Sequence, residues 1–178
     1  MIPQTKRKTR RKKAIPQFVG KAGQLALMAE LAFRGYNVSM PEIDIGDDIF
    51  VINHKTNFLW RIQVKTSKPK ATIGERPRTT SFQFNLKKEA IEVDNQTTNL
   101  AFVMRLQNEW KFCIFTIDQV RTYIKLGKFG TPAKNNYVIY FSWHLQDQHL
   151  SSGGGKNKLD LTEYLSEWHK RWPDLTID

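Results

Sequence analysis

The chain has 178 residues, of which 40% are hydrophobic and 12% aromatic, enough to bury the core of one domain. No apolar run approaches the ~18 residues that a membrane helix needs, and the basic N-terminus lacks the apolar segment of a signal peptide. We therefore expect a cytoplasmic protein. The single cysteine, Cys113, excludes an internal disulfide and a zinc site built from several thiolates, and its apolar surroundings indicate a core residue.

The formal charge of +11 is unevenly distributed along the chain. Seven of the 28 basic residues lie at positions 6–13, and the remaining sequence has 21 basic against 17 acidic side chains. Such a charged run does not pack into a core, so we predict that residues 1–16 form a disordered arm that binds phosphates without reading sequence. The alternative is a solubilising or localising tail. The arm's candidate contacts are Lys6, Arg7, Arg10 and Arg11.

Residues 17–34 have apolar side chains at intervals of three and four, which predicts a helix that ends at Gly35. Its apolar stripe consists of Phe18, Ala22, Leu25, Ala29 and Phe33. Small residues such as Gly20 and Gly23 would let this helix approach a sheet closely. Strands are predicted at residues 36–40, 48–53, 58–66, 82–86, 100–106, 110–116 and 137–143. Helices are expected at residues 118–125 and 87–93.

These elements predict an α/β fold in one domain, with a mixed β-sheet core over residues 17–150 and flanking helices. The Ser/Gly-rich segment 151–158 should be a flexible linker. Residues 159–178 should form a final helix, opened by a capping box of Asp160 and Glu163. We expect its stripe to dock on the domain, or alternatively on a second subunit. The stripe consists of Leu161, Tyr164, Leu165, Trp168 and Trp172.

The hairpin of residues 48–66 carries the most informative polar side chains. If its loop is residues 54–57, paired positions sum to 111, which places Asp48 opposite Gln63 and puts Lys65 on the same face as Gln63. The other face then collects a coherent apolar set, Ile49, Val51, Trp60 and Ile62. A carboxylate, an amide and an amine should therefore converge.

Burying Asp48 and Lys65 near an apolar sheet is costly unless they pair with each other or with a metal. A structural ion pair is one interpretation. Glu30 favours a functional centre, because its helical neighbours are mostly apolar and its carboxylate should face the sheet; a solvated Glu30 beside Arg34 is the alternative. Oxygen ligands suit Mg²⁺ or Mn²⁺, and an ammonium beside the metal suits phosphodiester hydrolysis.

Three segments together resemble the PD-(D/E)XK nuclease superfamily: the helix with Glu30, PEIDIGDDIFV at residues 41–51, and RIQVKTS at residues 61–67. They are most similar to the branch of intron-associated homing endonucleases whose lysine motif reads QVK. The resemblance covers residues 20–67 and rests on the order and spacing of short motifs. It implies a restriction-endonuclease-like fold and a Mg²⁺-dependent endonuclease that hydrolyses DNA, with Mn²⁺ as a substitute.

The resemblance also implies roles for individual residues. Asp48, Gln63 and the carbonyl of Val64 would bind the metal, Lys65 would orient or activate the attacking water, and Glu30 would hold a metal-bound water or a second ion. Gln63 departs from the family pattern, which more often has Glu or Asp there. A neutral amide supplies less charge than a carboxylate, so weaker metal affinity is expected.

Asp44 and Asp47 are rival metal ligands, of which Asp44 is favoured because it would lie near the entry of the strand. Beyond Lys65 the chain is basic, with Glu75 as the sole acid before Lys88, which suits a DNA backbone; an ordinary exposed loop is the alternative. The candidate DNA contacts are Lys68, Lys70, Arg76, Arg78, Lys87 and Lys88.

The expected partner is duplex or branched DNA, with a nucleoid-associated location and a setting in a mobile genetic element or defence system. Cutting both strands commonly takes two active sites, so a homodimer or higher oligomer is expected. Two alternatives stay open: a catalytically silent DNA-binding module of the same fold, and an assembly subunit of a mobile-element complex.

Overall fold

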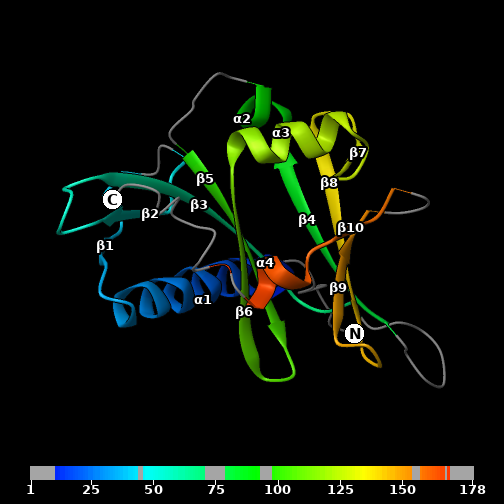
Figure 1. Cartoon of the computed structure of the whole chain (residues 1–178), viewed down its shortest axis with the longest axis horizontal. Coiled ribbons are helices and arrows are strands. Elements are labelled where there is room, and N and C mark those ends of the chain that lie inside the picture. Colours follow the sequence, from blue (N-terminus) through cyan, green and yellow to red (C-terminus); the bar gives the residue numbers. More distant parts are fainter. Residues whose placement is uncertain are drawn as a thin grey trace, which may run out of the picture.

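The computed structural model describes residues 11–43, 46–70, 79–92, 98–153, 157–166 and 168. They form three layers: helix α1 (Arg11–Phe33), a mixed sheet, and a second, antiparallel sheet (Figure 1). The first sheet has the order β1 (Asn37–Ser39), β2 (Ile49–Ile52), β3 (Leu59–Ser67), β5 (Thr98–Leu106) and β6 (Glu109–Thr116). The second has the order β10 (Leu159–Asp160), β9 (His149–Ser152), β8 (Asn136–His144) and β4 (Thr79–Lys87).

Three short helices and one short strand adjoin the two sheets. Helices α2 (Lys88–Glu92) and α3 (Ile117–Lys125) follow β4 and β6, β7 (Thr131–Pro132) pairs with β8, and α4 (Thr162–Ser166) follows β10. The predicted strands and both short helices are thereby confirmed, with ends shifted by a few residues. In the described part of the chain, no helix is long and apolar enough to cross a membrane.

Strand β3 holds the first sheet together, because it pairs antiparallel with β2 and parallel with β5. The antiparallel register matches Ile49 with Ile62 and Val51 with Trp60, so paired positions sum to 111 as predicted. The loop closes through a hydrogen bond of 3.0 Å from the Asn53 N–H to the Phe58 carbonyl. This register decides which β3 side chains face α1.

The first sheet is covered on both faces, and a separate core lies on each side. Toward α1, Leu27 and Leu31 pack on Ile49, Val51 and Ile62, all of them fully buried. Between the sheets the core is aromatic, and the Phe102 ring lies 5.0 Å from that of Phe84 and 5.1 Å from that of Phe141. The largest side chains of this core are Phe82, Phe102, Phe115, Phe129 and Phe141.

Cys113 belongs to the core between the sheets, as predicted. Burial removes the thiol from water and thereby raises its pKa, since the thiolate would be poorly solvated there. Cys113 is therefore a packing residue.

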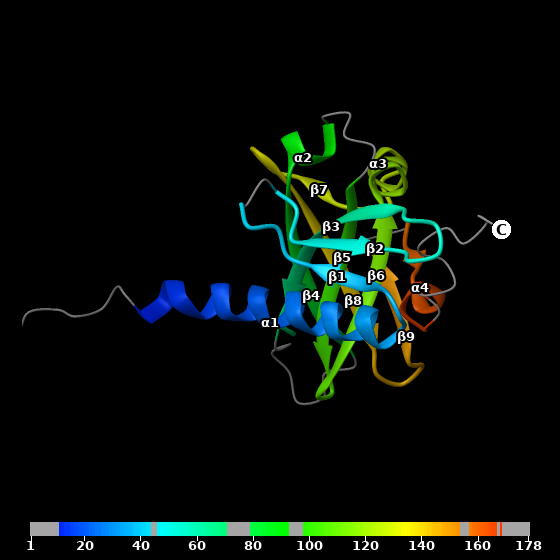
Figure 2. The ribbon, with the colours of Figure 1, turned by 90° about the vertical axis from the view of Figure 1, so that its left-hand side faces the viewer.

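Helix α1 differs from its prediction in start and orientation. It begins at Arg11 and includes Pro16, so residues 11–16 are helical and not part of a disordered arm; residues 1–10 lie outside the described residues. The predicted apolar stripe faces outward, with Phe18 74% and Phe33 88% exposed. Figure 2 shows α1 lying along the first sheet and extending beyond it toward its N-terminal end.

The face of α1 that meets the sheet is set by a glycine. A Cβ on Gly23 would lie 2.9 Å from the Thr66 Cβ and closer still to its hydroxyl, so only glycine lets the helix approach β3 this closely. Leu27 and Leu31 follow Gly23 at four-residue intervals and continue the same contact.

The C-terminal prediction was wrong in its boundaries. Ser151 and Ser152 are buried in strand β9 and are not linker, because their backbone pairs with β8 and β10. Residues 159–160 form a strand, and α4 begins only at Thr162. The Thr162 N–H donates to Asp160 at 2.8 Å, which lowers the pKa of that carboxyl.

The described part of this segment packs on the domain. Leu161 is fully buried and Trp168 is 5% exposed. The Trp168 ring lies 6.1 Å from that of Phe112 and 5.0 Å from the Arg34 guanidinium. Trp172 lies outside the described residues.

Replacing Gly23 with alanine should destabilise the fold, because the new methyl group would push against Thr66. We expect a loss of about 1–3 kcal/mol in unfolding free energy, measured by urea denaturation. Gly20→Ala is the matched control, since a Cβ there meets nothing within 4 Å. That variant should be neutral or more stable by up to ~1 kcal/mol. Equal stability of the two variants would contradict this helix placement.

Candidate active site

The candidate site lies on the part of β3 that extends past β2. Strand β2 begins at Ile49, opposite Ile62, so none of the described strands pairs with β3 on that side from Gln63 onward. Ile62 packs toward α1, and the alternation of side chains therefore directs Gln63 and Lys65 to the opposite face. Both side chains are half-buried. The sequence prediction that they share one face is confirmed by this geometry.

Asp48 lies beside this open edge. Its N–H donates to the Ile62 carbonyl at 2.8 Å, and its Oδ2 accepts a hydrogen bond of 2.6 Å from the Val64 N–H. The contacts to residues 62 and 64 place Asp48 across from Gln63, as the register predicted. The carboxylate thus takes the position that a partner-strand carbonyl would occupy farther along the ladder.

Gln63 is oriented by the turn that precedes Asp48. Its Nε2 donates to the Gly46 carbonyl at 2.8 Å, and Gly46 has a φ of +97°, a conformation that favours glycine. With its amide nitrogen held there, the Oε1 of Gln63 points away from the turn, and it accepts no hydrogen bond from any described residue.

Val64 contributes its backbone to the same place. In a strand, the N–H and C=O of one residue point to the same side, so the Val64 carbonyl is directed toward the edge where its N–H meets Asp48. Three oxygens, from Asp48, Gln63 and Val64, are therefore available around one edge of β3.

These oxygens fit a hard divalent cation such as Mg²⁺, which prefers carboxylate, amide and carbonyl ligands. Among the described residues, no three His, Cys, Asp or Glu side chains come together as a metal site. Asp48 is the only carboxylate among the donors described above, and the rival ligand Asp44 lies outside the described residues.

Glu30 makes no hydrogen bond or ion pair with these residues, and its predicted role in the site stays a prediction. Its Oε1 accepts from the Arg34 guanidinium at 2.7 Å, the pairing considered as the alternative. The α1 residue that reaches the site is Gln24, whose side-chain amide donates to the Asp48 carbonyl. Glu30 follows Gln24 by six residues, about 9 Å along the helix axis.

Sequence reasoning missed Gln24. The signal was its position three residues before Leu27, on the helix face that meets the sheet. Lys21 Nζ in turn donates to the Gln24 Oε1 at 3.0 Å, which orients the amide toward Asp48.

Asp47, the other rival ligand, is held by contacts within the fold. Its carboxylate is 3% exposed and forms an ion pair with Arg61, at 2.5 Å to the guanidinium. Thr98 Oγ1 donates to its other oxygen at 3.3 Å. Through these two contacts, the Asp47 carboxylate holds the turn before Asp48 against β3 and β5.

The comparisons with known proteins identify the architecture. No protein-family model and no curated protein matches the sequence. Among solved structures, the bacterial homing endonuclease I-Ssp6803I is similar with a TM-score of 0.50 and 16% identity, over 86% of this chain and 89% of that one. A Holliday junction resolvase from Archaeoglobus fulgidus, Hjc, covers 67% of this chain and 81% of its own with a TM-score of 0.40 and 15% identity.

The chain shares its fold with the homing endonuclease I-Ssp6803I. The restriction-endonuclease-like fold predicted from the QVK resemblance is therefore confirmed. In this chain the residues of the QVK segment lie at the open edge of β3 described above.

The predicted DNA contacts are only partly described. Lys68, Lys70 and Lys87 are exposed, and the Lys88 ammonium lies 5.8 Å from the Tyr137 ring centroid. Arg11 is the first residue of α1. The other predicted contacts, Lys6, Arg7, Arg10, Arg76 and Arg78, lie outside the described residues.

Replacing Asp47 with asparagine should cost stability, because it removes the charge that neutralises Arg61. Removing one partner of a buried pair costs about 3–5 kcal/mol, and the 28% exposure of the Arg61 side chain reduces the expected loss to roughly 2–3 kcal/mol. Urea unfolding at pH 7 measures it.

Asp48→Asn is the matched comparison for Asp47→Asn. Its amide oxygen can still accept from the Val64 N–H, so we expect a change below about 1 kcal/mol. If Asp47→Asn unfolds at the wild-type denaturant concentration, the bracing role of Asp47 is wrong.

Proposed function

We propose that this protein is a metal-dependent endonuclease that hydrolyses phosphodiester bonds in DNA. The observation that carries the proposal is the group at the open edge of β3, where Asp48 and the backbone of Val64 meet beside Gln63 and Lys65. Oxygen ligands next to an ammonium are the donor set that metal-assisted phosphodiester hydrolysis requires. The likeness of the fold to a homing endonuclease supports the same class of reaction.

Asp48, the Gln63 Oε1 and the Val64 carbonyl would hold Mg²⁺, or Mn²⁺ in its place. The metal would polarise a phosphoryl oxygen and make a bound water more acidic. Because Gln63 is neutral, the site should bind the metal more weakly than one with a second carboxylate. Glu30 has no part in this proposal, since its carboxylate is paired with Arg34.

The chain's own side chains supply the remaining electrostatics. Lys65 follows Gln63 by two residues on the same face, about 7 Å along the strand, where its ammonium would stabilise the negative charge that develops on the phosphate. The hydrogen bonds from Val64 and Gln24 hold Asp48 in place before substrate binds. Gln24 is thus a positioning residue.

The substrate in this proposal is duplex or branched DNA. Basic residues that follow Lys65, among them the exposed Lys68 and Lys70, would contact its phosphates. We extend the proposal to a homodimer or higher oligomer, because each protomer carries one such centre and a double-strand cut needs two. A mobile-element or defence setting and a nucleoid location belong to the same proposal.

Cleavage of supercoiled plasmid by the purified protein tests the central step. We expect nicking with Mg²⁺ or Mn²⁺ that EDTA stops. Asp48→Ala and Lys65→Ala should each lower the rate at least about a hundredfold, the usual cost of removing a group that stabilises transition-state charge. Both variants should still bind labelled duplex.

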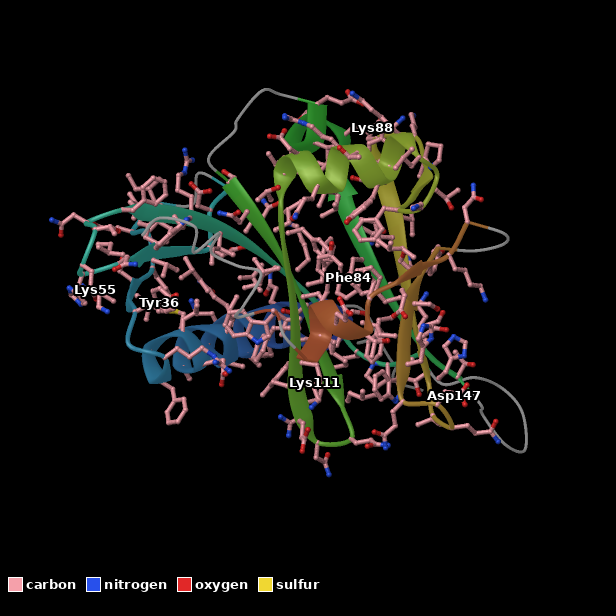
Figure 3. All side chains as sticks on the ribbon, viewed as in Figure 1. Tyr36, Lys55, Phe84, Lys88, Lys111 and Asp147 are labelled. Carbon is pink, nitrogen blue, oxygen red and sulfur yellow. The ribbon has the colours of Figure 1, made fainter. Side chains whose placement is uncertain are left out.

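Asp147→Ala and Lys111→Ala serve as matched controls, since both side chains lie at the lower end of the molecule in Figure 3. Asp147 is exposed in the turn after β8, and Lys111 forms only a surface ion pair with Glu109. Both should cut at the wild-type rate. Tight DNA binding without cleavage under every metal would instead indicate the silent DNA-binding module.

Gln24 and Glu30 provide a second test, because the structure connects only the former to Asp48. Gln24→Ala should lower the cleavage rate by about tenfold, since a loosened carboxylate holds the metal less well. Glu30→Ala should have a smaller effect. Rates are measured over a range of Mg²⁺ concentrations, and excess Mg²⁺ should partly restore Gln24→Ala. If Glu30→Ala lowers the cleavage rate more than Gln24→Ala does, Glu30 takes part in the site.

A further inference from the structure

The outward face of β4 carries polar side chains that the fold does not need. Phe82, Phe84 and Leu86 point into the core between the sheets, so the alternate residues Ser81, Gln83 and Asn85 point away from it. On the neighbouring strand β8, Gln83 pairs with Tyr140, which is 42% exposed. Strands β4 and β8 run side by side over nine paired residues (Figure 1).

The hydrogen bonds between side chains on this face run in one direction, from Lys70 to Gln83 to Asn85. Lys70 Nζ donates to the Gln83 Oε1, and the Gln83 Nε2 donates to the Asn85 Oδ1 at 3.5 Å. The Gln83 oxygen therefore faces the Lys70 ammonium, the Asn85 oxygen faces the Gln83 amide nitrogen, and the Asn85 amide nitrogen points onward along the strand. That nitrogen donates to no acceptor in the described part of the chain. The Asn85 amide nitrogen can therefore donate a hydrogen bond to a bound ligand.

The charge of this face suits a polyanion. Strands β4 and β8 contain no Asp or Glu, whereas Lys87 ends β4 and Lys70 stands at its side. Side-chain amides can make paired hydrogen bonds to the N6 and N7 edge of adenine, and an exposed tyrosine offers apolar contact beside them. Lysines alone would position a DNA backbone without distinguishing its bases.

The face is rigidly connected to the candidate active site. The Gln83 N–H donates to Ser67 Oγ at 3.1 Å, and Ser67 follows Lys65 by two residues on the same face of β3. Lys65 is therefore about 7 Å along the strand from the residue that holds Gln83. The Lys70 N–H adds a second contact, to the Ser81 carbonyl at 2.9 Å. A duplex whose phosphate lies at Lys65 would have a groove within reach of β4.

We propose that the outward face of β4, with Gln83 and Asn85 as the reading side chains and Lys70 as a phosphate contact, selects the base sequence that this protein cuts. This inference rests on the proposed nuclease function. It adds the residues that determine specificity, for which the sequence offered no candidate.

A pool of linear duplexes with a randomised central segment tests this assignment. The pool is cut by wild type in Mg²⁺ and the cleaved ends are sequenced. Gln83→Ala and Asn85→Ala should each reduce the preference at one or two adjacent base pairs by about tenfold, and preferences elsewhere in the site should persist. Lys70→Ala should lower cleavage of all sequences alike. Asn157→Ala, an exposed amide beside β10 at the other edge of the second sheet, should give the wild-type profile.

The outcomes separate this inference from the proposed function. Two results would refute the assignment of base reading to β4 and leave the proposed nuclease function intact. In the first, wild type cuts the pool but Gln83→Ala and Asn85→Ala keep its full base preferences. In the second, wild type cuts the pool without any base preference. If wild type cuts no duplex with Mg²⁺ or Mn²⁺, both proposals are wrong. Unchanged thermal unfolding of the variants excludes a general loss of structure.

Discussion

The hydrogen bond from the Val64 N–H to Asp48 depends on the position at which β2 begins. Because β2 starts at Ile49, Asp48 is the first residue outside the ladder, and its carboxylate replaces a strand carbonyl at the edge of β3. An additional β2 residue would fill that edge with backbone. The candidate site is thus made by ending a strand early, beside side chains whose direction the strand already fixes.

Apolar packing on the opposite face keeps that arrangement in register. Ile49, Val51 and Ile62 are fully buried against α1, so a one-residue slip would turn their side chains away from the helix and turn Gln63 and Lys65 toward it. The Gly23 contact with Thr66 fixes the depth of the helix, and depth decides whether Gln24 reaches the Asp48 carbonyl. The helix therefore stabilises the sheet with its leucines and positions the site with its glutamine.

Features governed by local periodicity were predictable from the sequence. The hairpin register followed from a four-residue loop and a period of two, and with it came the position of Asp48 across from Gln63. The α1 stripe was not predictable, because the helix has a second apolar row that stays exposed and only the Gly23 contact selects between them. Ser151 and Ser152 were misread because composition does not report strand pairing. The role of Glu30 stays a prediction, because its pairing with Arg34 does not test it.

The proposed metal centre at the edge of β3 can be tested through the effect of Mn²⁺ on backbone amide signals in ¹⁵N-resolved spectra. Paramagnetic broadening falls steeply with distance, so it locates the ion without reference to activity. We expect substoichiometric Mn²⁺ to broaden the amides of Asp48, Gln63 and Val64 first, and Asp48→Ala to remove the effect. Broadening centred on other residues, or unchanged in Asp48→Ala, would show that the metal does not bind at this edge.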